Sequence, residues 1–513
     1  MIKAIALPTI GKDLDASTTI SWAGTSSLIA NTCFQVLYGR LSDIFGRKGV
    51  FLSCVLLLGV GDLACGFAQT GPQLYGFRAI SGVAAGGIGA LTMMIVSDIV
   101  TLENRGKYQG ILGSCIGLGN VIGPFLAAIF IEKSTWRGLF WLLAPCTVVA
   151  AVVIFFILPK SIVVGDPKGK IKAIDFAGVG LSTTAVLLIL IPVSGGGTYF
   201  QWNSPMVISM LVVGSLAAVA FIIVEWKFAK MPMMPLHLYR IPAVGAILVQ
   251  NFLFGIVYQS NLYYLPLYFQ IVEGYSPIES AALLVPFVAM QSIISTSAGW
   301  YISTTKRYGE VIWTGYTLWT LGAGLTLTFA RDFAIWKIVL ILAVEGSGVG
   351  MIFQPTLVAA QAHSKKSDRA VVIAVRNFLR SFGGAVGLAL SAAVYSNSLK
   401  NHLLNASITL PSTVTTTILG SILSVPDTSS LNASQADEVL DAYMAASKSV
   451  FYIWAPLMAC CLVLCVLIKD KGLARAEEKV EKTSTESEAK RTSITEPAYK
   501  SMADVDVENQ REQ

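Results

Sequence analysis

Thirteen apolar segments, each long enough to cross a bilayer as a helix, follow one another along this chain. A bilayer-spanning helix needs roughly 20 mostly apolar residues. Helices also satisfy every backbone polar group internally, as the hydrocarbon core demands. We therefore predict an all-α polytopic membrane protein, with spans at residues 18–39, 49–68, 72–97, 108–131, 139–158, 174–195, 205–225, 241–272, 276–303, 309–330, 335–362, 370–397 and 448–468.

The composition excludes several classes of protein. Charged residues make up 13% of the 513 residues, against about 25% in soluble domains, which excludes a water-soluble enzyme or a disordered chain. The eight cysteines and three histidines form no CxxC pair or Cys/His cluster, so we expect no metal site and no disulfide framework. No P-loop, HExxH or GxSxG motif is present. We therefore expect a protein that is not an enzyme, has no catalytic residues and no cofactor, and draws its energy from a proton gradient.

The lysines and arginines between the spans predict the orientation. Alternate connections hold 17 of them and the opposite connections hold seven. Because basic loops stay in the cytoplasm, the richer set is expected there, which also explains the net charge of +6 without a nucleic-acid partner. The tail 469–513 is expected to be a disordered cytoplasmic extension. Residues 398–447 are expected outside, with Asn405 and Asn432 as glycosylation acceptors of the N-x-[ST] type.

The connection after the first complete span carries a dense motif, Gly39-Arg40-Leu-Ser-Asp43-Ile-Phe-Gly46-Arg47-Lys48. It resembles the signature between the second and third helices of the major facilitator superfamily. The resemblance implies a gate, in which Gly39 lets helices approach closely. Asp43 would meet the positive N-terminus of the span that begins near Ala370. The alternative is a basic cytoplasmic loop.

Two further segments resemble motifs of the same family. Gly110, Gly119, Gly123 and Pro124 resemble the fifth-helix antiporter motif, with alanines in place of its final glycine pair. The resemblance implies a smooth helix face that keeps a cavity shut, and general packing of small residues is the alternative. Arg78 resembles the buried arginine of the fourth helix, and the alternative is an arginine that reaches the outer interface.

The whole chain resembles the 14-helix drug:proton antiporter branch, in particular its fungal members. The resemblance implies two six-helix halves, at 1–160 and 241–468, joined by a linker at 161–240 that holds two inserted helices. In this family an aspartate lies seven residues before the position of Ala6, which falls ahead of Met1, so we expect a truncated first helix.

The implied function is proton-coupled efflux of small amphipathic organic molecules (drugs, antifungals, toxins or secondary metabolites) by alternating access. We expect a monomer in the lipid bilayer of the plasma membrane, with the vacuolar membrane as the alternative and the C-terminus in the cytoplasm. Transport of siderophore-iron or basic amino acids on the same fold is the second hypothesis. A receptor or membrane enzyme is a third class, which the absent catalytic motifs disfavour.

Several polar residues inside the spans are further candidates. Asp62 and Glu345 are the candidates for a proton-linked role. Asp62 and Arg78 each lie roughly 9 Å below the outer boundary, so they can pair if their faces meet. Gln259, Tyr263 and Gln270 share a helix face with Pro266, which suits a substrate cavity or helix packing equally. Arg376 and Arg380 are expected to extend toward the cytoplasmic interface.

Overall fold

The chain is almost entirely helical where the computed structural model describes it. The described residues are 10–16, 19–20, 22–159, 175–196, 200–228, 232–365, 368–404, 418, 432–470 and 472–473. The predicted stub before Ile10, the tail after residue 473 and the acceptor Asn405 lie outside them. The structure therefore leaves the truncated first helix and the disordered tail as predictions.

The helices follow the predicted spans in order. The N-terminal half holds α2 (Trp22–Phe45), α3 (Arg47–Gly66), α4 (Gly71–Ile99), α5 (Leu102–Lys133) and α6 (Trp136–Ile157). The inserted pair is α8 (Phe176–Gly195) and α9 (Pro205–Lys227). The C-terminal half holds α10 (Pro242–Ile271), α11 (Pro277–Leu283), α12 (Val285–Thr305), α13 (Gly309–Leu325), α14 (Ile335–Phe353), α15 (Pro355–Ala362), α16 (Arg369–Leu404) and α18 (Ala433–Leu464).

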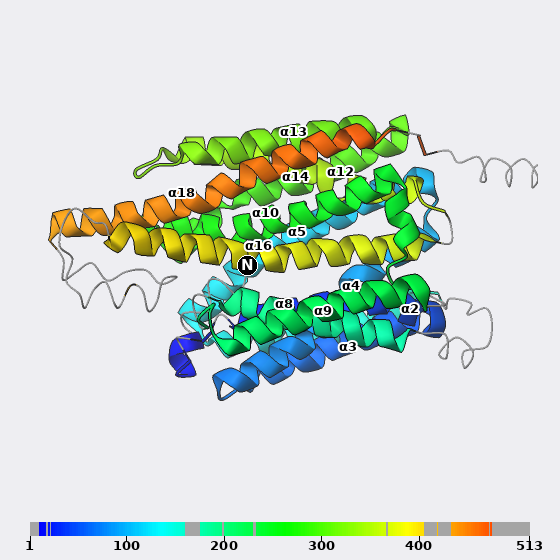
Figure 1. The fold of residues 1–513 in the computed structure, drawn as a ribbon, viewed down its shortest axis with the longest axis horizontal. Coiled ribbons are helices and arrows are strands. Elements are labelled where there is room, and N and C mark those ends of the chain that lie inside the picture. The colour runs from blue at the N-terminus through cyan, green and yellow to red at the C-terminus, as the bar shows by residue number, and fades with distance from the viewer. Residues whose placement is uncertain are drawn as a thin grey trace, which may run out of the picture.

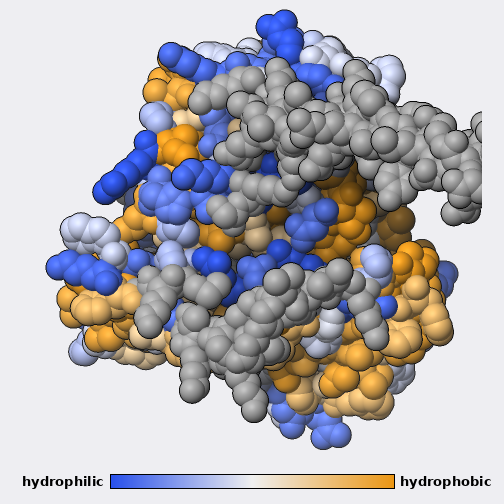
Figure 2. Space-filling view, turned by 90° about the vertical axis from the view of Figure 1, so that its right-hand side faces the viewer, coloured by the Kyte–Doolittle hydropathy of each residue, from blue (hydrophilic) through white to orange (hydrophobic). Residues whose placement is uncertain are grey.

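The all-α polytopic fold is confirmed. Within the described part of the chain, 11 helical segments are long and apolar enough to cross a membrane. The predicted spans 18–39 and 309–330 correspond to α2 and α13, which are also helices. Large apolar side chains such as Phe156 and Val463 are exposed along the sides of the bundle, where lipid would cover them. Figure 2 looks at one end of the bundle and shows hydrophilic residues at its centre and along parts of its rim, with hydrophobic patches between them.

Two groups of parallel helices lie side by side in Figure 1. The groups meet through two helix pairs, because α5 packs along α12 and α2 packs along α16. The inserted helices α8 and α9 pack on each other, and α8 also contacts α2 and α16. Each half therefore contributes one long helix to each side of the central interface.

Two predicted spans are broken by proline. The span 276–303 is divided into α11 and α12, and Pro286 lies in the first turn of α12. The span 335–362 is divided at Gln354 into α14 and α15, and Pro355 begins α15. Proline lacks the backbone N–H of the helix ladder and clashes with the preceding turn, so each helix restarts there.

The predicted outer loop 398–447 is shorter than expected, because α16 continues to Leu404 and α18 begins at Ala433. Asn432 and Gln435 form a capping box that starts α18. Arg331 pairs with Asp437 at 2.6 Å and with Asp441 at 3.0 Å. These hydrogen bonds raise the pKa of Arg331 and tie the α13–α14 connection to the polar start of α18. The length of an apolar segment therefore underestimates the length of a helix such as α18, whose polar first turns are stabilised by a capping box and by ion pairs.

Candidate functional site

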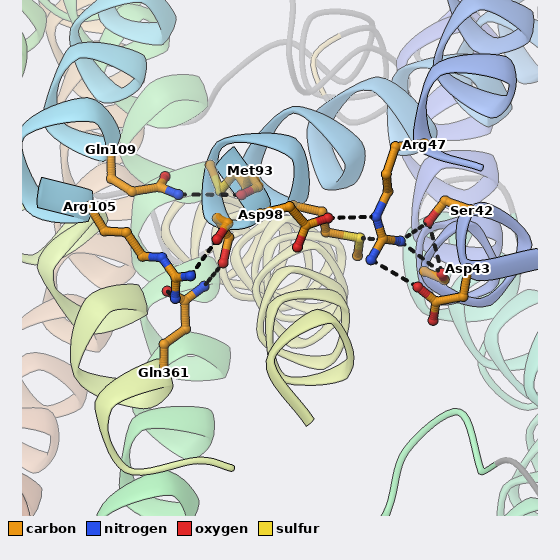
Figure 3. A network of polar contacts seen from close by, with 11 residues as sticks. Ser42, Asp43, Arg47, Met93, Asp98, Arg105, Gln109 and Gln361 are labelled. Atoms are coloured by element: carbon orange, nitrogen blue, oxygen red, sulfur yellow. Dashed lines mark hydrogen bonds and ion pairs between the residues drawn. The ribbon is translucent and has the colours of Figure 1, made fainter. Parts of the chain in front are cut away.

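The end of the bundle that carries residues 39–48 is called here the signature end, and the end that carries Arg331 and Asn432 is called the loop end. At the signature end Arg47 is the centre of a polar network (Figure 3). Its guanidinium lies 2.8 Å from Asp43 and 2.9 Å from Asp98, and it also donates to Ser42 Oγ. The network ties α2, α3 and α4 together within the N-terminal half.

The other residues of the 39–48 motif stabilise the same turn between α2 and α3. Gly46 has a φ of +86°, which glycine adopts without strain, and it forms the turn between α2 and α3. Arg40 donates to the carbonyl of Pro232, and Lys48 Nζ donates to the carbonyl of Phe155 at 2.6 Å. A Cβ on Gly39 would lie 3.4 Å from the side chains of Ala374 and Met94, so α2 approaches α16 closely there.

Asp43 has an ion-pair partner in its own half. Its carboxylate pairs with Arg47, which begins α3 on the far side of the Gly46 turn. The contact that we expected between Asp43 and the N-terminus of the span near Ala370 stays a prediction. Asp43 and Arg47 flank the turn at Gly46, which brings them together locally, and the contact with α16 is made by Gly39.

The close contact between α5 and α12 is made by glycine. A Cβ on Gly110 would lie 2.6 Å from the carbonyl oxygen of Ser295, and one on Gly106 would lie 2.8 Å from that of Gly299. Gly113 and Gly117 approach the side chains of Ser295 and Ser292 still more closely. These four residues of α5 follow a spacing of four, three and four, and therefore lie on one helix face.

The antiporter motif is thus only partly the contact face. A Cβ on Gly119 would meet nothing within 4 Å. Nine residues at about 100° each place Gly119 opposite Gly110 on the helix. Gly123 is buried, and the side chain of Pro124 lies outside the described residues. Sequence reasoning missed Gly106, Gly113 and Gly117, although their helical spacing was a readable signal.

Polar contacts also join the two halves at the signature end (Figure 3). Arg105 Nη1 donates to Gln361 Oε1 at 3.1 Å, and Gln361 Nε2 donates to Ser97 Oγ at 3.3 Å. Lys306 lies 3.5 Å from Glu103 in a second link between the halves. The contacts thus close the signature end. In the sequence Arg105 is only one of the 17 basic residues that predict the orientation, because its partner lies 256 positions away.

The buried arginine of α4 has the partner that its depth suggested. Arg78 Nη1 lies 3.5 Å from Asp62 Oδ1, and Ser81 Oγ donates to the same oxygen at 2.8 Å. Both side chains are largely buried, and the guanidinium also lies over the Phe140 ring. The predicted contact between α3 and α4 is therefore present, while its role in transport stays a prediction.

Glu345 lies inside the C-terminal half. It is fully buried, and its Oε2 accepts from Asn261 Nδ2 at 3.2 Å. Its Oε1 has no hydrogen-bond partner among the described residues. Gly322 of α13 leaves the space that its side chain fills. The carboxyl of this α14 residue thus lies against α10 and α13, and one of its oxygens has no described hydrogen-bond partner.

The break between α14 and α15 gathers polar groups that the sequence did not reveal. Arg376 of α16 is 1% exposed and donates to the carbonyl of Phe353 and, at 3.0 Å, to Thr356 Oγ1. Gln354, also 1% exposed, has no partner for either end of its amide in the described chain. Our expectation that Arg376 extends to the interface is wrong, because these buried oxygens supply acceptors inside the bundle.

Arg380 lies one turn further into α16 and does not extend to the interface either. Its guanidinium carbon lies 4.5 Å from the centroid of the Phe353 ring, and its buried Nη1 has no described partner. Nearby, Tyr258 donates to Gln291 Oε1 at 3.3 Å and accepts from Asn120 of the opposite half at 3.3 Å. A polar region therefore lies at the interface between the halves.

The cavity predicted at Gln259, Tyr263 and Gln270 stays a prediction. All three side chains are half-buried on α10. Gln259 packs beside Gly384 of α16, and the ring of Tyr263 lies edge-on to that of Tyr264. A cavity of about 300 Å³ lies at the loop end, lined by Asn401, His402, Glu438, Asp441 and Ala442. The described chain holds no cluster of three or more potential metal ligands.

Comparison with known proteins now identifies the family. The family model described as Major Facilitator Superfamily matches residues 1–388. The chain belongs to this superfamily. It is 50% identical over 482 residues to "Citrate exporter 1" of Yarrowia lipolytica, covering 94% of this chain and 71% of that protein. It is 34% identical over 403 residues to "Efflux pump dotC" of Dothistroma septosporum, covering 78% of this chain and 68% of that protein.

A solved structure supports the same fold. The proton:xylose symporter XylE is similar with a TM-score of 0.60 at 12% identity, covering 93% of this chain and 94% of that one. At such low identity the likeness concerns the fold alone. The chain is therefore an integral membrane transporter of the major facilitator type and not an enzyme, and it is similar to fungal proteins named as exporters and efflux pumps.

The glycine face of α5 generates a first prediction. Gly110→Ala places a methyl group against the backbone of α12. This clash should destabilise the closed arrangement of the two halves by about 1–3 kcal/mol. We expect slower substrate export and faster maleimide labelling of a cysteine introduced as Ser303→Cys at the signature end. Gly119→Ala is the matched control, since it meets nothing. Equal labelling and export in the two alanine variants would contradict the contact.

The Asp62–Arg78 pair generates a second prediction. Asp62→Arg and Arg78→Asp should each leave a charge buried beside a like charge, a loss of about 3–5 kcal/mol for breaking a buried pair. We expect poor folding or transport in each single variant, measured by monodisperse yield and export rate. The double exchange should recover part of both. A double variant no better than the single ones would show that the two residues act separately.

Proposed function

We propose that this transporter exports a small organic acid by alternating access and is driven by the proton gradient. One observation supports the substrate class: Arg376 is buried and Arg380 is half-buried with a buried Nη1, and their described hydrogen-bond partners include no carboxylate. A buried cation without a fixed counter-ion favours an anionic ligand. Transport of basic amino acids would meet repulsion at the same place.

The relatives support this substrate class and direction. The name of the Yarrowia protein identifies it as a citrate exporter, and half of the aligned residues are identical in this chain. We infer that citrate or a similar acid is exported here too. The proposed substrate class differs from the amphipathic drugs or toxins that the sequence led us to expect. Such molecules stay the second candidate, because Phe254, Tyr258 and Phe353 place aromatic surface beside Arg380.

Glu345 is the acid we propose for proton coupling. It is the fully buried carboxyl of the C-terminal half that keeps one oxygen unsatisfied, and a group of that kind is costly to hold charged inside a membrane. Asp62 is the weaker candidate, because Arg78 and Ser81 already compensate it.

We also infer the orientation from the basic residues, which places the signature end and the C-terminus in the cytoplasm and the loop end outside. The plasma membrane is the proposed location, and Asn432, exposed at the start of α18, would then carry a glycan. The protein should lose an endoglycosidase-sensitive mass when Asn432→Gln and Asn405→Gln are combined, with each single variant as the control. If protease added outside intact cells cleaved a C-terminal tag, the proposed orientation would be wrong.

Energy coupling gives the test of the function itself. In inside-out vesicles that hold a proton gradient, labelled citrate should accumulate and then be released by a protonophore while ATP remains. Glu345→Gln should abolish the response to the gradient but preserve citrate exchange, because exchange needs no net proton movement. Glu310→Gln, at an exposed carboxyl of the signature end, is the matched control. Accumulation that survives the protonophore and stops on ATP depletion would refute the coupling.

A further inference from the structure

We propose that Arg376, Arg380 and Gln354 form a binding site for an acid with at least two carboxylate groups. The proposal rests on the proposed export of organic acids and adds the place and the number of charges that the transporter recognises. The three side chains come from α16 and from the break between α14 and α15, beside the interface between the halves.

The first arginine keeps an uncompensated charge. Arg376 donates to the carbonyl of Phe353, to Thr356 Oγ1 and to Asn377 Oδ1, which are all neutral acceptors. Its Nε has no hydrogen-bond partner among the described residues. The described contacts therefore orient the guanidinium without neutralising it. An anion that reaches Arg376 would meet a positioned, partly desolvated cation.

The second arginine adds a like charge one turn away. Arg376 and Arg380 are four residues apart on α16, a rise of about 6 Å. They are close enough to act on each other electrostatically. The buried Nη1 of Arg380 is unpartnered in the described chain, and the group rests on the face of Phe353. Two neighbouring cations without a described acid between them are stabilised by a ligand that brings one carboxylate to each.

The helix break supplies neutral donors at the same place. Gln354 is buried with both amide atoms unpartnered in the described chain, and it lies between Phe353 and Thr356, the two residues of the break to which Arg376 donates. Gln354 is the N-cap of the eight-residue helix α15, so it lies at the positive end of the dipole of that helix. Interrupted membrane helices use such ends to hold anionic groups of a substrate. The amide would bind a carboxylate or hydroxyl of the same acid.

The conformation described here covers this site from the opposite half. A Cβ on Gly113 of α5 would lie 3.2 Å from Cγ of Gln354, so α5 packs directly on the amide. The cross-half contacts Arg105–Gln361 and Lys306–Glu103 lie between the site and the signature end. Separation of the halves at that end would uncover Gln354 and Arg376. An acid would then enter from the signature end, as export from the cytoplasm requires.

The number of carboxylates follows from the two cations. A carboxylate binds one guanidinium through two parallel hydrogen bonds. An acid with one carboxylate satisfies one arginine and leaves the other charge buried and unpaired. A short acid with two or three carboxylates can span one helical turn and satisfy both. We therefore expect affinity in the order citrate, succinate, acetate.

The test is binding of these three acids to the full-length protein in lipid nanodiscs, by calorimetry or scintillation proximity. Arg380→Gln should weaken citrate binding by at least about tenfold, because a charge-assisted hydrogen bond is lost. It should also bring the affinity for citrate close to that for acetate, because only one arginine remains. Arg380→Lys should restore part of the loss. Arg307→Gln, an exposed arginine of the signature end, is the matched control.

Arg376→Gln can fail to fold, because Arg376 also holds the helix break. Gln354→Leu is the second variant, since it removes the amide but keeps the arginines, and it should weaken citrate binding with normal monodispersity. Citrate binding within twofold of the wild type in both Arg380→Gln and Gln354→Leu, or acetate bound as tightly as citrate, would overturn the site. Arginine-dependent citrate binding without efflux from proteoliposomes would uphold the site and overturn the proposed export.

Discussion

A charged side chain at the centre of a bilayer costs roughly 3 kcal/mol even on insertion scales, and the polar interior of this transporter is arranged around that cost. Arg78 is offset by Asp62, and Arg105 donates to the Gln361 amide oxygen and to the backbone carbonyls of Val100 and Ser97. Arg376 and Glu345 are only partly satisfied among the described residues. Arg78 lies within one half, and Arg105 belongs to the contacts that close the signature end. Arg376 and Glu345 lie in the C-terminal half, where a ligand or a proton can complete their interactions.

The contacts that hold the halves together differ from those within each half. Along α5 and α12 the two backbones touch at Gly106, Gly110 and Gly299. Such contacts depend on shape, so they can release and form again without leaving large apolar surfaces in water. The network of Arg47 with Asp43 and Asp98 lies wholly within the N-terminal half. It stiffens one half as a unit, and the glycine face and Arg105 make the contact that must open.

The sequence was sufficient for features that depend on local pattern. Apolar length predicted the membrane spans but not the breaks before α12 and α15, and equal depth predicted the pair of Asp62 and Arg78, because the short turn between α3 and α4 limits where they can lie. It was insufficient where the outcome depends on distant partners. Arg376 was assigned to the interface because its acceptor on Phe353 lies 23 positions away and is free only because Pro355 interrupts the helix. The contact face of α5 was incomplete, since a motif gives residue types and not the direction in which each side chain points.

The proposed proton acid and the proposed anion site share one helix. Glu345 lies nine residues before Gln354 on α14, about 13 Å along the axis. Between them α14 packs with backbone contact at Gly346 and Gly348, where an added Cβ would strike Phe287 and Trp319. Close packing without free volume transmits displacement, because neither neighbour can yield. A change of charge at Glu345 that shifts α14 must therefore act on the break at Gln354, and an anion bound at the break must act on Glu345 by the same free energy. Under this arrangement proton and acid need not meet, since the rigid helix between them couples their binding.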